Sequence, residues 1–150
     1  MTRIMFVCLG NICRSPMAEF VFKDMVKARG LESEFYIASS ATSNEEIGNS
    51  VYPPARKELA LHGIACDGKK ATRLKWEDYD NYDFFVGMDS SNIRSMNIIL
   101  KGDKQKKIRK LMDYTFRRGD VADPWYTDRF DIAYRDIYDG CEGLLNALLK

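Results

Sequence analysis

The chain has 150 residues, and its 23 basic and 22 acidic side chains leave a formal net charge of only +1. This balance gives no global electrostatic reason to expect binding to nucleic acid, and no apolar run approaches the roughly 20 residues that span a bilayer. The length suits one domain over residues 1–150. The N-terminus lacks a signal-peptide cleavage site, and the four cysteines have no disulfide-framework or zinc spacing. We therefore expect a cytoplasmic protein with reduced thiols.

Strands and helices are predicted to alternate along the chain. In chain order, the sequence first predicts a strand over residues 3–9, a helix that Ser15 caps and Gly30 ends, a strand over 34–42 and a helix from Pro54 to about His62. It then predicts a strand over 82–89, a helix that Asp89 or Ser90 caps and that runs to about Ile99, a short strand over 107–112 and a last helix from about Thr127. The strands are continuous apolar runs, which is typical of strands buried on both faces. This pattern favours an α/β fold, with a parallel sheet and helices on both faces. Gly140 and Gly143 are expected to weaken the last helix locally.

The stretch VCLGNICRSP, residues 7–16, joins the first strand to the first helix. Ligands bind at the carboxyl ends of the strands in such sheets, and a helix N-terminus attracts anions. Gly10 and Asn11 tolerate left-handed backbone angles, so the loop can turn its N–H groups inward as an anion nest. Cys8, at the end of the strand, would face the floor of that nest.

Arg14 follows Cys8 after five intervening residues, close enough to hold two oxygens of a bound phosphate with its planar guanidinium. The loop amides, the helix dipole and Arg14 all favour a thiolate at Cys8, and Ser15 can donate its hydroxyl to that sulfur. The pattern predicts attack by sulfur on a phosphorus-like centre through a covalent thiophosphate. A Cys-x5-Arg pattern also arises by chance, and a cysteine at the end of a buried strand is usually a core residue.

Breaking a phosphate ester also requires an acid for the leaving oxygen. In the loop over residues 115–128, Asp123 precedes Pro124, which biases its backbone to an extended conformation. Trp125 and Tyr126 follow and can line a cleft that accepts an aromatic ring. The alternative is that Asp-Pro is an ordinary turn signal and that Asp128 caps the last helix.

Taken together, these residues resemble the low-molecular-weight protein tyrosine phosphatases. The first motif, VCLGNICRSPMAE over residues 7–19, is highly specific, and SSATS, HGI, MDSSN and DPWY follow in the order of the family. The resemblance covers essentially the whole chain. It implies a three-layer fold with a four-stranded parallel sheet (phosphotyrosine phosphatase I-like), no metal and no cofactor. It also implies hydrolysis of phosphotyrosine in proteins and of aryl phosphates, with inorganic phosphate as product and inhibitor.

The resemblance also implies roles for individual residues. Cys8 is the nucleophile, Arg14 holds the transferring phosphoryl group, and Asp123 acts as general acid and then as general base. The phosphate-binding loop comprises Leu9, Gly10, Asn11, Ile12, Cys13, Arg14 and Ser15. Trp125, Tyr126 and Glu45 belong to the substrate pocket. Cys13 resembles a second cysteine that forms a reversible disulfide with Cys8 under oxidation.

The sequence departs from the family pattern at two places. Members often carry a histidine near the position of residues 68–70, where this chain has Gly-Lys-Lys, and the only histidine, His62, is expected to be structural. Glu45 and Glu46 stand where some members carry an aromatic residue, so acidic phosphopeptides are expected to be poor substrates.

Three other functions remain possible from the residues. An arsenate reductase on the same scaffold needs two further cysteines near the middle of the chain, where only Cys66 is present. A cysteinyl phosphocarrier module needs neither Arg14 nor Asp123. A non-catalytic phosphotyrosine-binding module is disfavoured because both Cys8 and Asp123 are intact.

Overall fold

The computed structural model describes all residues from Met1 to Lys150. Its centre is a sheet of four parallel strands in the order β2-β1-β3-β4. The strands are β1 (Thr2–Cys8), β2 (Phe35–Ala41), β3 (Phe84–Gly87) and β4 (Ile108–Lys110). The predicted α/β fold with a four-stranded parallel sheet is therefore confirmed.

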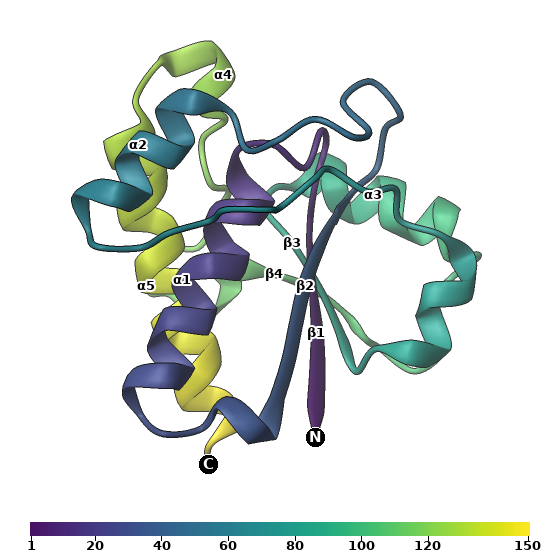
Figure 1. The fold of residues 1–150 in the computed structure, drawn as a ribbon. Helices are drawn as coiled ribbons and strands as arrows, with labels where there is room; N and C mark the ends of the chain where they lie inside the picture. Colours follow the sequence, from purple (N-terminus) through teal and green to yellow (C-terminus); the bar gives the residue numbers. More distant parts are fainter.

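Helices cover both faces of this sheet. They are α1 (Arg14–Ala28), α2 (Pro53–Leu61), α3 (Ser90–Ile99), α4 (Pro124–Thr127) and α5 (Phe130–Leu148), with short 3-10 segments η1 (Glu32–Glu34), η2 (Trp76–Asn81) and η3 (Leu111–Tyr114). Figure 1 shows α1, α2 and α5 on one side of the sheet and α3 on the other. None of the helices combines the length and the apolar character that crossing a membrane requires.

The central strand β1 is buried on both of its faces. Ile4 and Phe6 belong to a large hydrophobic cluster that includes residues of α1 and α5, whereas Met5 and Val7 belong to a smaller cluster with residues of β3 and α3. Because successive strand residues point to opposite faces, burial on both sides requires apolar residues at every position. This explains why the sequence has a continuous apolar run there.

The predicted helix cap at Ser15 is wrong, and the alternative cap at Asp128 does not form. Helix α1 begins at Arg14, so its N-cap position is Cys13, and Ser15 lies inside the first turn with its hydroxyl directed to other partners. Helix α5 begins at Phe130, and Asp128 instead ends α4 with a left-handed φ of 58°. Tertiary hydrogen bonds and a tight turn prevail over local capping preference at these positions. The fourth strand also ends earlier than predicted, because η3 begins at Leu111.

The two glycines of α5 have a packing role that the sequence did not indicate. A methyl group added at Gly143 would collide with the backbone carbonyl oxygen of Tyr114, and one added at Gly140 would collide with the side chain of Leu111. Both contacts lie in η3, so the glycines allow this segment to approach α5 closely. The cost in helix propensity is therefore accompanied by tight packing between the two elements.

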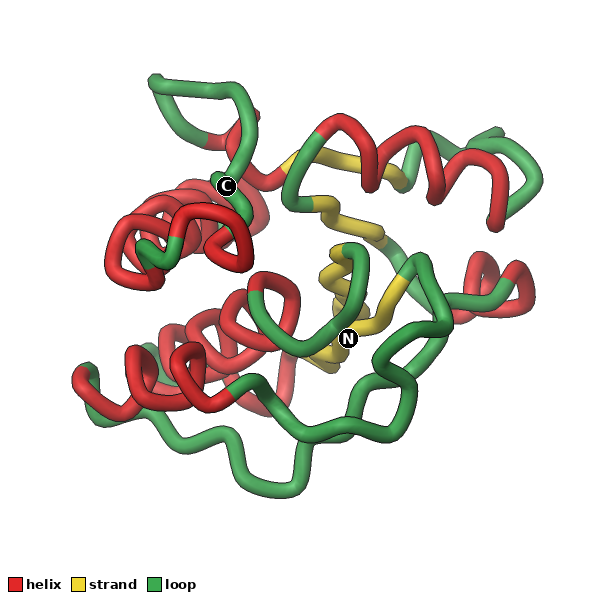
Figure 2. Tube along the Cα trace, turned by 90° about the horizontal axis from the view of Figure 1, so that it is seen from above, coloured by secondary structure: helices red, strands yellow, loops and turns green.

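The loop after β1 lies at the carboxyl end of the sheet, where β1 has β2 on one side and β3 on the other. Such a topological switch point is where open α/β sheets bind ligands. Neighbouring loops hold this one through backbone hydrogen bonds, from Thr42 N to Cys8 O (3.0 Å) and from Tyr52 N to Ile12 O (2.9 Å). Both chain termini lie at the opposite end (Figure 1), and Figure 2 looks down on the switch point, with the strands between the helical layers.

Candidate active site

The loop between β1 and α1 surrounds the Cys8 sulfur with hydrogen-bond donors. The backbone N–H groups of Asn11 and Ser15 donate to Cys8 Sγ, with N···S distances of 3.3 and 3.4 Å. The Ser15 hydroxyl oxygen lies 3.0 Å from the same sulfur. Asn11 has a left-handed φ of 59°, whereas Gly10 does not have a positive φ, so Asn11 makes the turn that directs the amides inward.

The side-chain amide of Asn11 fixes the direction of the hydroxyl groups near Cys8. Its Oδ1 accepts a bond from Thr72 N (3.1 Å), so Nδ2 is the donor, and it donates to Ser15 Oγ (2.8 Å) and Ser39 Oγ (2.9 Å). Because Ser15 Oγ already accepts this bond, its own proton is available to the Cys8 sulfur. Asn11 is only 1% exposed, so water does not compete for these bonds. The amide therefore supports a hydroxyl donor that faces the sulfur.

Behind the loop, the hydrogen-bond network ends at the buried carboxylate of Glu19. Ser39 Oγ donates to Glu19 Oε1 (2.5 Å), and Lys23 Nζ donates to Glu19 Oε2 (2.6 Å). Lys69 Nζ lies 3.6 Å from Glu19 Oε1 and donates to the backbone oxygen of Ser39 (2.8 Å). Burial lowers the pKa of Lys69, and the Glu19 carboxylate offsets only part of this effect. Of residues 68–70, where the sequence lacks the histidine, Lys69 is thus the one that joins the network.

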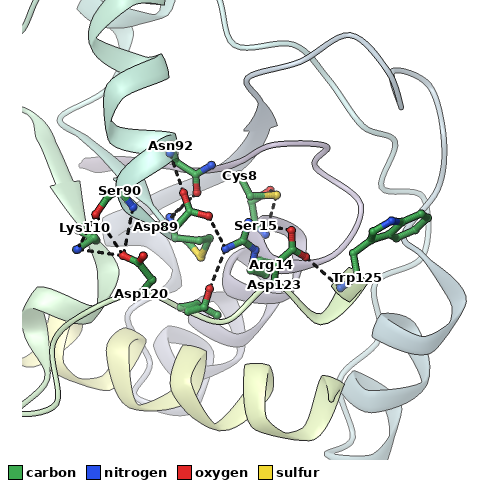
Figure 3. A network of polar contacts seen from close by, with 12 residues as sticks. Cys8, Arg14, Ser15, Asp89, Ser90, Asn92, Lys110, Asp120, Asp123 and Trp125 are labelled. Carbon is green, nitrogen blue, oxygen red and sulfur yellow. Dashed lines mark hydrogen bonds and ion pairs between the residues drawn. The ribbon is translucent and has the colours of Figure 1, made fainter. Parts of the chain in front are cut away.

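Arg14 is buried and connects three segments that are far apart in the sequence. Its Nη1 donates to Asp89 Oδ2 and to the backbone oxygen of Val121, both at 2.8 Å, and its Nη2 lies 3.5 Å from Asp123 Oδ2. Burial alone would lower the pKa of Arg14, but the negative charges of Cys8, Asp123 and Asp89 outweigh burial and raise it. Figure 3 shows the guanidinium between the two carboxylates.

Asp89 is a site residue that the sequence reasoning treated only as a helix cap. It is indeed the N-cap of α3, because its Oδ1 accepts from Asn92 N (2.8 Å). Its second oxygen holds Arg14. This aspartate belongs to the MDSSN segment of the family resemblance, and the resemblance gives it no role in catalysis.

Asp123 also divides its two oxygens between two partners. Its Oδ1 accepts from Trp125 N (3.0 Å), which makes Asp123 the N-cap of α4, and its Oδ2 faces Arg14. The turn signal and the proposed catalytic position therefore coexist in one residue. The side chain of Trp125 packs against Tyr52, with ring centroids 5.0 Å apart. Tyr52, which the sequence reasoning missed, lies just before α2 and supports this tryptophan from behind.

The predicted catalytic and pocket residues line a single cleft of about 150 Å³. Its lining residues are Cys8, Leu9, Gly10, Ile12, Cys13, Arg14, Ser43, Glu45, Glu46, Asp123, Trp125 and Tyr126. Glu46 was expected to affect only the charge preference for the substrate, and Ser43 was not predicted at all. Ser43 Oγ is buried without a hydrogen-bond partner in the protein. Asn11 and Ser15 also belong to the phosphate-binding loop, but they are buried and do not line the cleft.

The four cysteines are free thiols, and all are buried. Burial, together with the negative charges of Cys8 and Asp123, raises the pKa of the Cys13 thiol to about 12. His62 lies outside the cleft, where it stacks on Tyr134 with ring centroids 3.7 Å apart and contacts Glu58 at 2.9 Å. These contacts agree with the structural role expected for it.

Comparison with known proteins decides the family. A profile of the family described as "Low molecular weight phosphotyrosine protein phosphatase" matches residues 3–150. The chain belongs to the low-molecular-weight protein-tyrosine-phosphatase family. The low-molecular-weight protein-tyrosine-phosphatase YfkJ from Bacillus subtilis (strain 168) is 37% identical in an alignment of 152 positions that covers 100% of this chain and 97% of that protein. The low-molecular-weight protein-tyrosine-phosphatase PtpA from Staphylococcus aureus (strain MRSA252) is 34% identical in an alignment of 154 positions that covers 100% of this chain and 96% of that protein.

Comparison with solved structures agrees with the assignment of this chain to the phosphatase family. The crystal structure of Bacillus subtilis YfkJ superposes with a TM-score of 0.95 and covers 99% of this chain and 95% of that chain. The low-molecular-weight phosphatase SP-PTP from Streptococcus pyogenes superposes with a TM-score of 0.90 at 35% identity, covering 100% of this chain and 95% of that chain. The protein is therefore a protein-tyrosine phosphatase that acts on phosphotyrosine substrates, and the arsenate-reductase and phosphocarrier alternatives are not supported.

Proposed function

We propose that this phosphatase hydrolyses phosphotyrosine in proteins through a phosphocysteine intermediate at Cys8, with Arg14 and Asp123 as its catalytic partners. The observation that carries the proposal is that three donors, from Asn11 and Ser15, converge on Cys8 Sγ in the cleft that Arg14 and Asp123 also line. A sulfur held in this way is stabilised as a thiolate, which is the nucleophilic form.

In the first step, the thiolate attacks phosphorus, so an S–P bond forms and the P–O bond to the tyrosyl ring breaks. Arg14 and the inward amides of the loop stabilise the charge on the non-bridging oxygens. Asp123, in its protonated form, gives its proton to the departing phenolate oxygen, so that the product leaves as a neutral phenol.

In the second step, Asp123 is a carboxylate and accepts a proton from water as that water attacks the phosphocysteine. The S–P bond breaks, inorganic phosphate forms, and the thiolate leaves. The Ser15 hydroxyl, held as a donor by Asn11, stabilises the departing thiolate. Inorganic phosphate keeps the three non-bridging oxygens of the transferred group. It is therefore expected to compete with the substrate for the phosphate-binding loop.

The outer part of the cleft supports an aromatic substrate. The side chains of Trp125 and Tyr126 are 52% and 82% exposed, so they offer apolar surface to a phenyl ring. Glu45 and Glu46 lie on the rim, and the only basic residue that lines the cleft is Arg14, which is already paired with Asp89. Acidic side chains next to the phosphotyrosine are therefore expected to be repelled, and basic ones attracted.

The proposal includes three further expectations. Residues 1–150 act as one catalytic domain, the location is cytoplasmic, and Cys13 forms a reversible disulfide with Cys8 under oxidation. The cysteines lack the spacing of a disulfide framework, which is usual in a reducing compartment, and Cys13 lines the same cleft as Cys8.

Turnover and ligand binding by Cys8→Ser test the nucleophile. This variant is expected to lose turnover of p-nitrophenyl phosphate while it still binds vanadate in a calorimetric titration. Cys66→Ser is the matched control, because Cys66 is also buried but does not line the cleft. Turnover by Cys8→Ser at the rate of this control would refute the mechanism.

A second assay compares a phosphotyrosine peptide with the phosphoserine peptide of the same sequence, and measures thioredoxin-coupled arsenate reduction in parallel. We expect hydrolysis of the phosphotyrosine peptide to dominate. Equal rates on both peptides would argue against an aromatic pocket at Trp125 and Tyr126.

A further inference from the structure

The loop over residues 115–123 carries Asp123, and we call it the acid loop. It is attached to the rest of the protein at Asp120, three residues before Asp123. Asp120 Oδ1 accepts from Lys110 Nζ (3.0 Å), from Ser90 N (3.2 Å) and from Ser90 Oγ (3.4 Å). Lys110 Nζ also donates to Ser90 Oγ (3.1 Å), which closes the cluster. Figure 3 shows Asp120 next to Ser90 and Lys110, on the far side of Asp89 from Cys8.

These partners come from two fixed elements of the fold. Ser90 is the first residue of α3, and Lys110 is the last residue of β4. Burial would raise the pKa of Asp120, but the hydrogen bond and charge of Lys110 and the bonds from Ser90 outweigh burial and lower it. The carboxylate is thus ionised near neutral pH and binds both elements at once.

The chain between Asp120 and Asp123 has one further attachment. Val121 is 1% exposed, its N–H donates to Met88 O (2.9 Å), and its carbonyl oxygen accepts from Arg14 Nη1 (2.8 Å). On the upstream side, Arg118 and Gly119 both have positive φ and lie in an exposed turn. Asp120 is therefore the first side-chain attachment of the acid loop after that turn.

We propose that Asp120, held by Ser90 and Lys110, is a positioning residue that sets the place of Asp123 for proton transfer to the leaving group. The inference rests on the proposed role of Asp123 as general acid. Three residues of extended chain span at most about 10 Å, so a shift at Asp120 is transmitted to Asp123 over a short segment. A misplacement of about 1 Å can cost up to about 100-fold in rate.

The test measures kcat/KM for two esters that differ in how much they need an acid. Phenyl phosphate has a poor leaving group, whereas 2,4-dinitrophenyl phosphate leaves without protonation. Asp120→Ala is expected to lower kcat/KM for phenyl phosphate about 10-fold and for the dinitrophenyl ester less than about 2-fold, since general acid catalysis as a whole contributes about 10²–10⁴-fold.

Two milder variants should give smaller effects in the same direction. Asp120→Asn keeps an oxygen that accepts from Ser90 but loses the charge that pairs with Lys110, and Lys110→Met removes the charge from the other side. Both should lower kcat/KM for phenyl phosphate about 3-fold. Because Asp120 is about half exposed (47% of its side chain), its substitution should leave the protein folded, which the unchanged affinity for vanadate will show.

Asp131→Asn is the matched control. Asp131 also forms an exposed ion pair, with Arg129 at 3.0 Å, but it lies beyond α4 and makes no bond to the acid loop. This control should retain the kcat/KM of the unaltered protein for both esters. An equal loss on both esters in Asp120→Ala, or no loss on either, would overturn the inference.

The double variant Asp120→Ala with Asp123→Ala separates this inference from the proposed function. If Asp120 acts through Asp123, the double variant should show no larger leaving-group-dependent loss than Asp123→Ala alone. A loss in Asp123→Ala that does not depend on the leaving group would refute the acid role of Asp123 itself. A leaving-group-dependent loss in Asp123→Ala that is absent in Asp120→Ala would refute only the positioning role of Asp120.

Discussion

Asn11→Asp keeps the shape of a buried side chain but replaces its amide donor with an acceptor. In the native protein, Nδ2 of Asn11 donates to Ser15 Oγ at 2.8 Å, which leaves the Ser15 proton for the Cys8 sulfur at 3.0 Å. A carboxylate at the same position would accept the Ser15 proton instead. Cys8 would lose its hydroxyl donor and would gain a buried negative charge nearby, so we expect Cys8 to react more slowly.

The size of this effect follows from the bond that is lost. A hydrogen bond to a charged group contributes about 1.5–3 kcal/mol, and every 1.4 kcal/mol is a factor of ten. We therefore expect kcat/KM for p-nitrophenyl phosphate to fall about 10- to 100-fold at pH 6. The added negative charge acts in the same direction, because it repels the negative charge on the sulfur and on the substrate phosphate.

The assay measures kcat/KM at pH 6 for Asn11→Asp, Asn11→Ala and the control Asn97→Asp. Asn97 is exposed, and its amide donates only to Ile93 O (3.0 Å) within α3, so the control should retain the kcat/KM of the unaltered protein. Asn11→Ala removes the donor without adding charge, so its loss should be smaller than that of Asn11→Asp. An unchanged kcat/KM in Asn11→Asp would refute the direction assigned to the Ser15 hydroxyl.

Further predictions concern the partly buried Lys69, the second cysteine Cys13 and the rim of the cleft. Lys69→Met should lower the free energy of unfolding by about 1–3 kcal/mol in urea titrations. This is less than the loss of a whole buried ion pair, because Lys23 still binds Glu19. Lys70→Met is the control, since Lys70 is exposed, and equal stability of the two variants would contradict the role of Lys69. After peroxide converts Cys8 to a sulfenic acid, the Cys13 thiol should displace water to form the disulfide. Because burial raises the pKa of the Cys13 thiol, its thiolate fraction and the rate of disulfide formation should increase as the pH is raised from 7 to 9. Peptide mapping that finds overoxidised Cys8 beside free Cys13 would contradict the disulfide. Finally, Glu45→Gln with Glu46→Gln should narrow the preference for lysine-flanked over glutamate-flanked phosphotyrosine peptides by about 2- to 5-fold at low salt, as expected for exposed charges; the same ratio as in the unaltered protein would exclude an electrostatic role of the rim.

The sequence indicated the parts of the site that lie close together along the chain. The segment from Cys8 to Ser15 contains the strand end, the left-handed turn and the helix start, so local rules are sufficient to predict an anion-binding loop. The Asp123-Pro124-Trp125-Tyr126 segment is similarly local, and its residues do line the same cleft as Cys8.

The parts that were missed depend on which segments the fold brings together. Asp89 meets Arg14 from 75 positions away, and Ser90 meets Asp120 from 30 positions away. These contacts require the register of the parallel strands, which no local pattern contains. The wrong cap at Ser15 has the same cause, because the capping rule does not include the competing bonds to Cys8 and Asn11.

The three contacts of Arg14 have a consequence for the order in which activity arises during folding. Its partners Asp89, Val121 and Asp123 are 75, 107 and 109 positions away along the chain. The contacts around the guanidinium therefore join segments from distant parts of the sequence. Closing a chain segment of this length costs conformational entropy before the contact stabilises the fold, so we expect these contacts to form late. A partly folded chain can therefore hold the phosphate-binding loop without its acid, and recovered phosphatase activity reports completion of the whole tertiary structure.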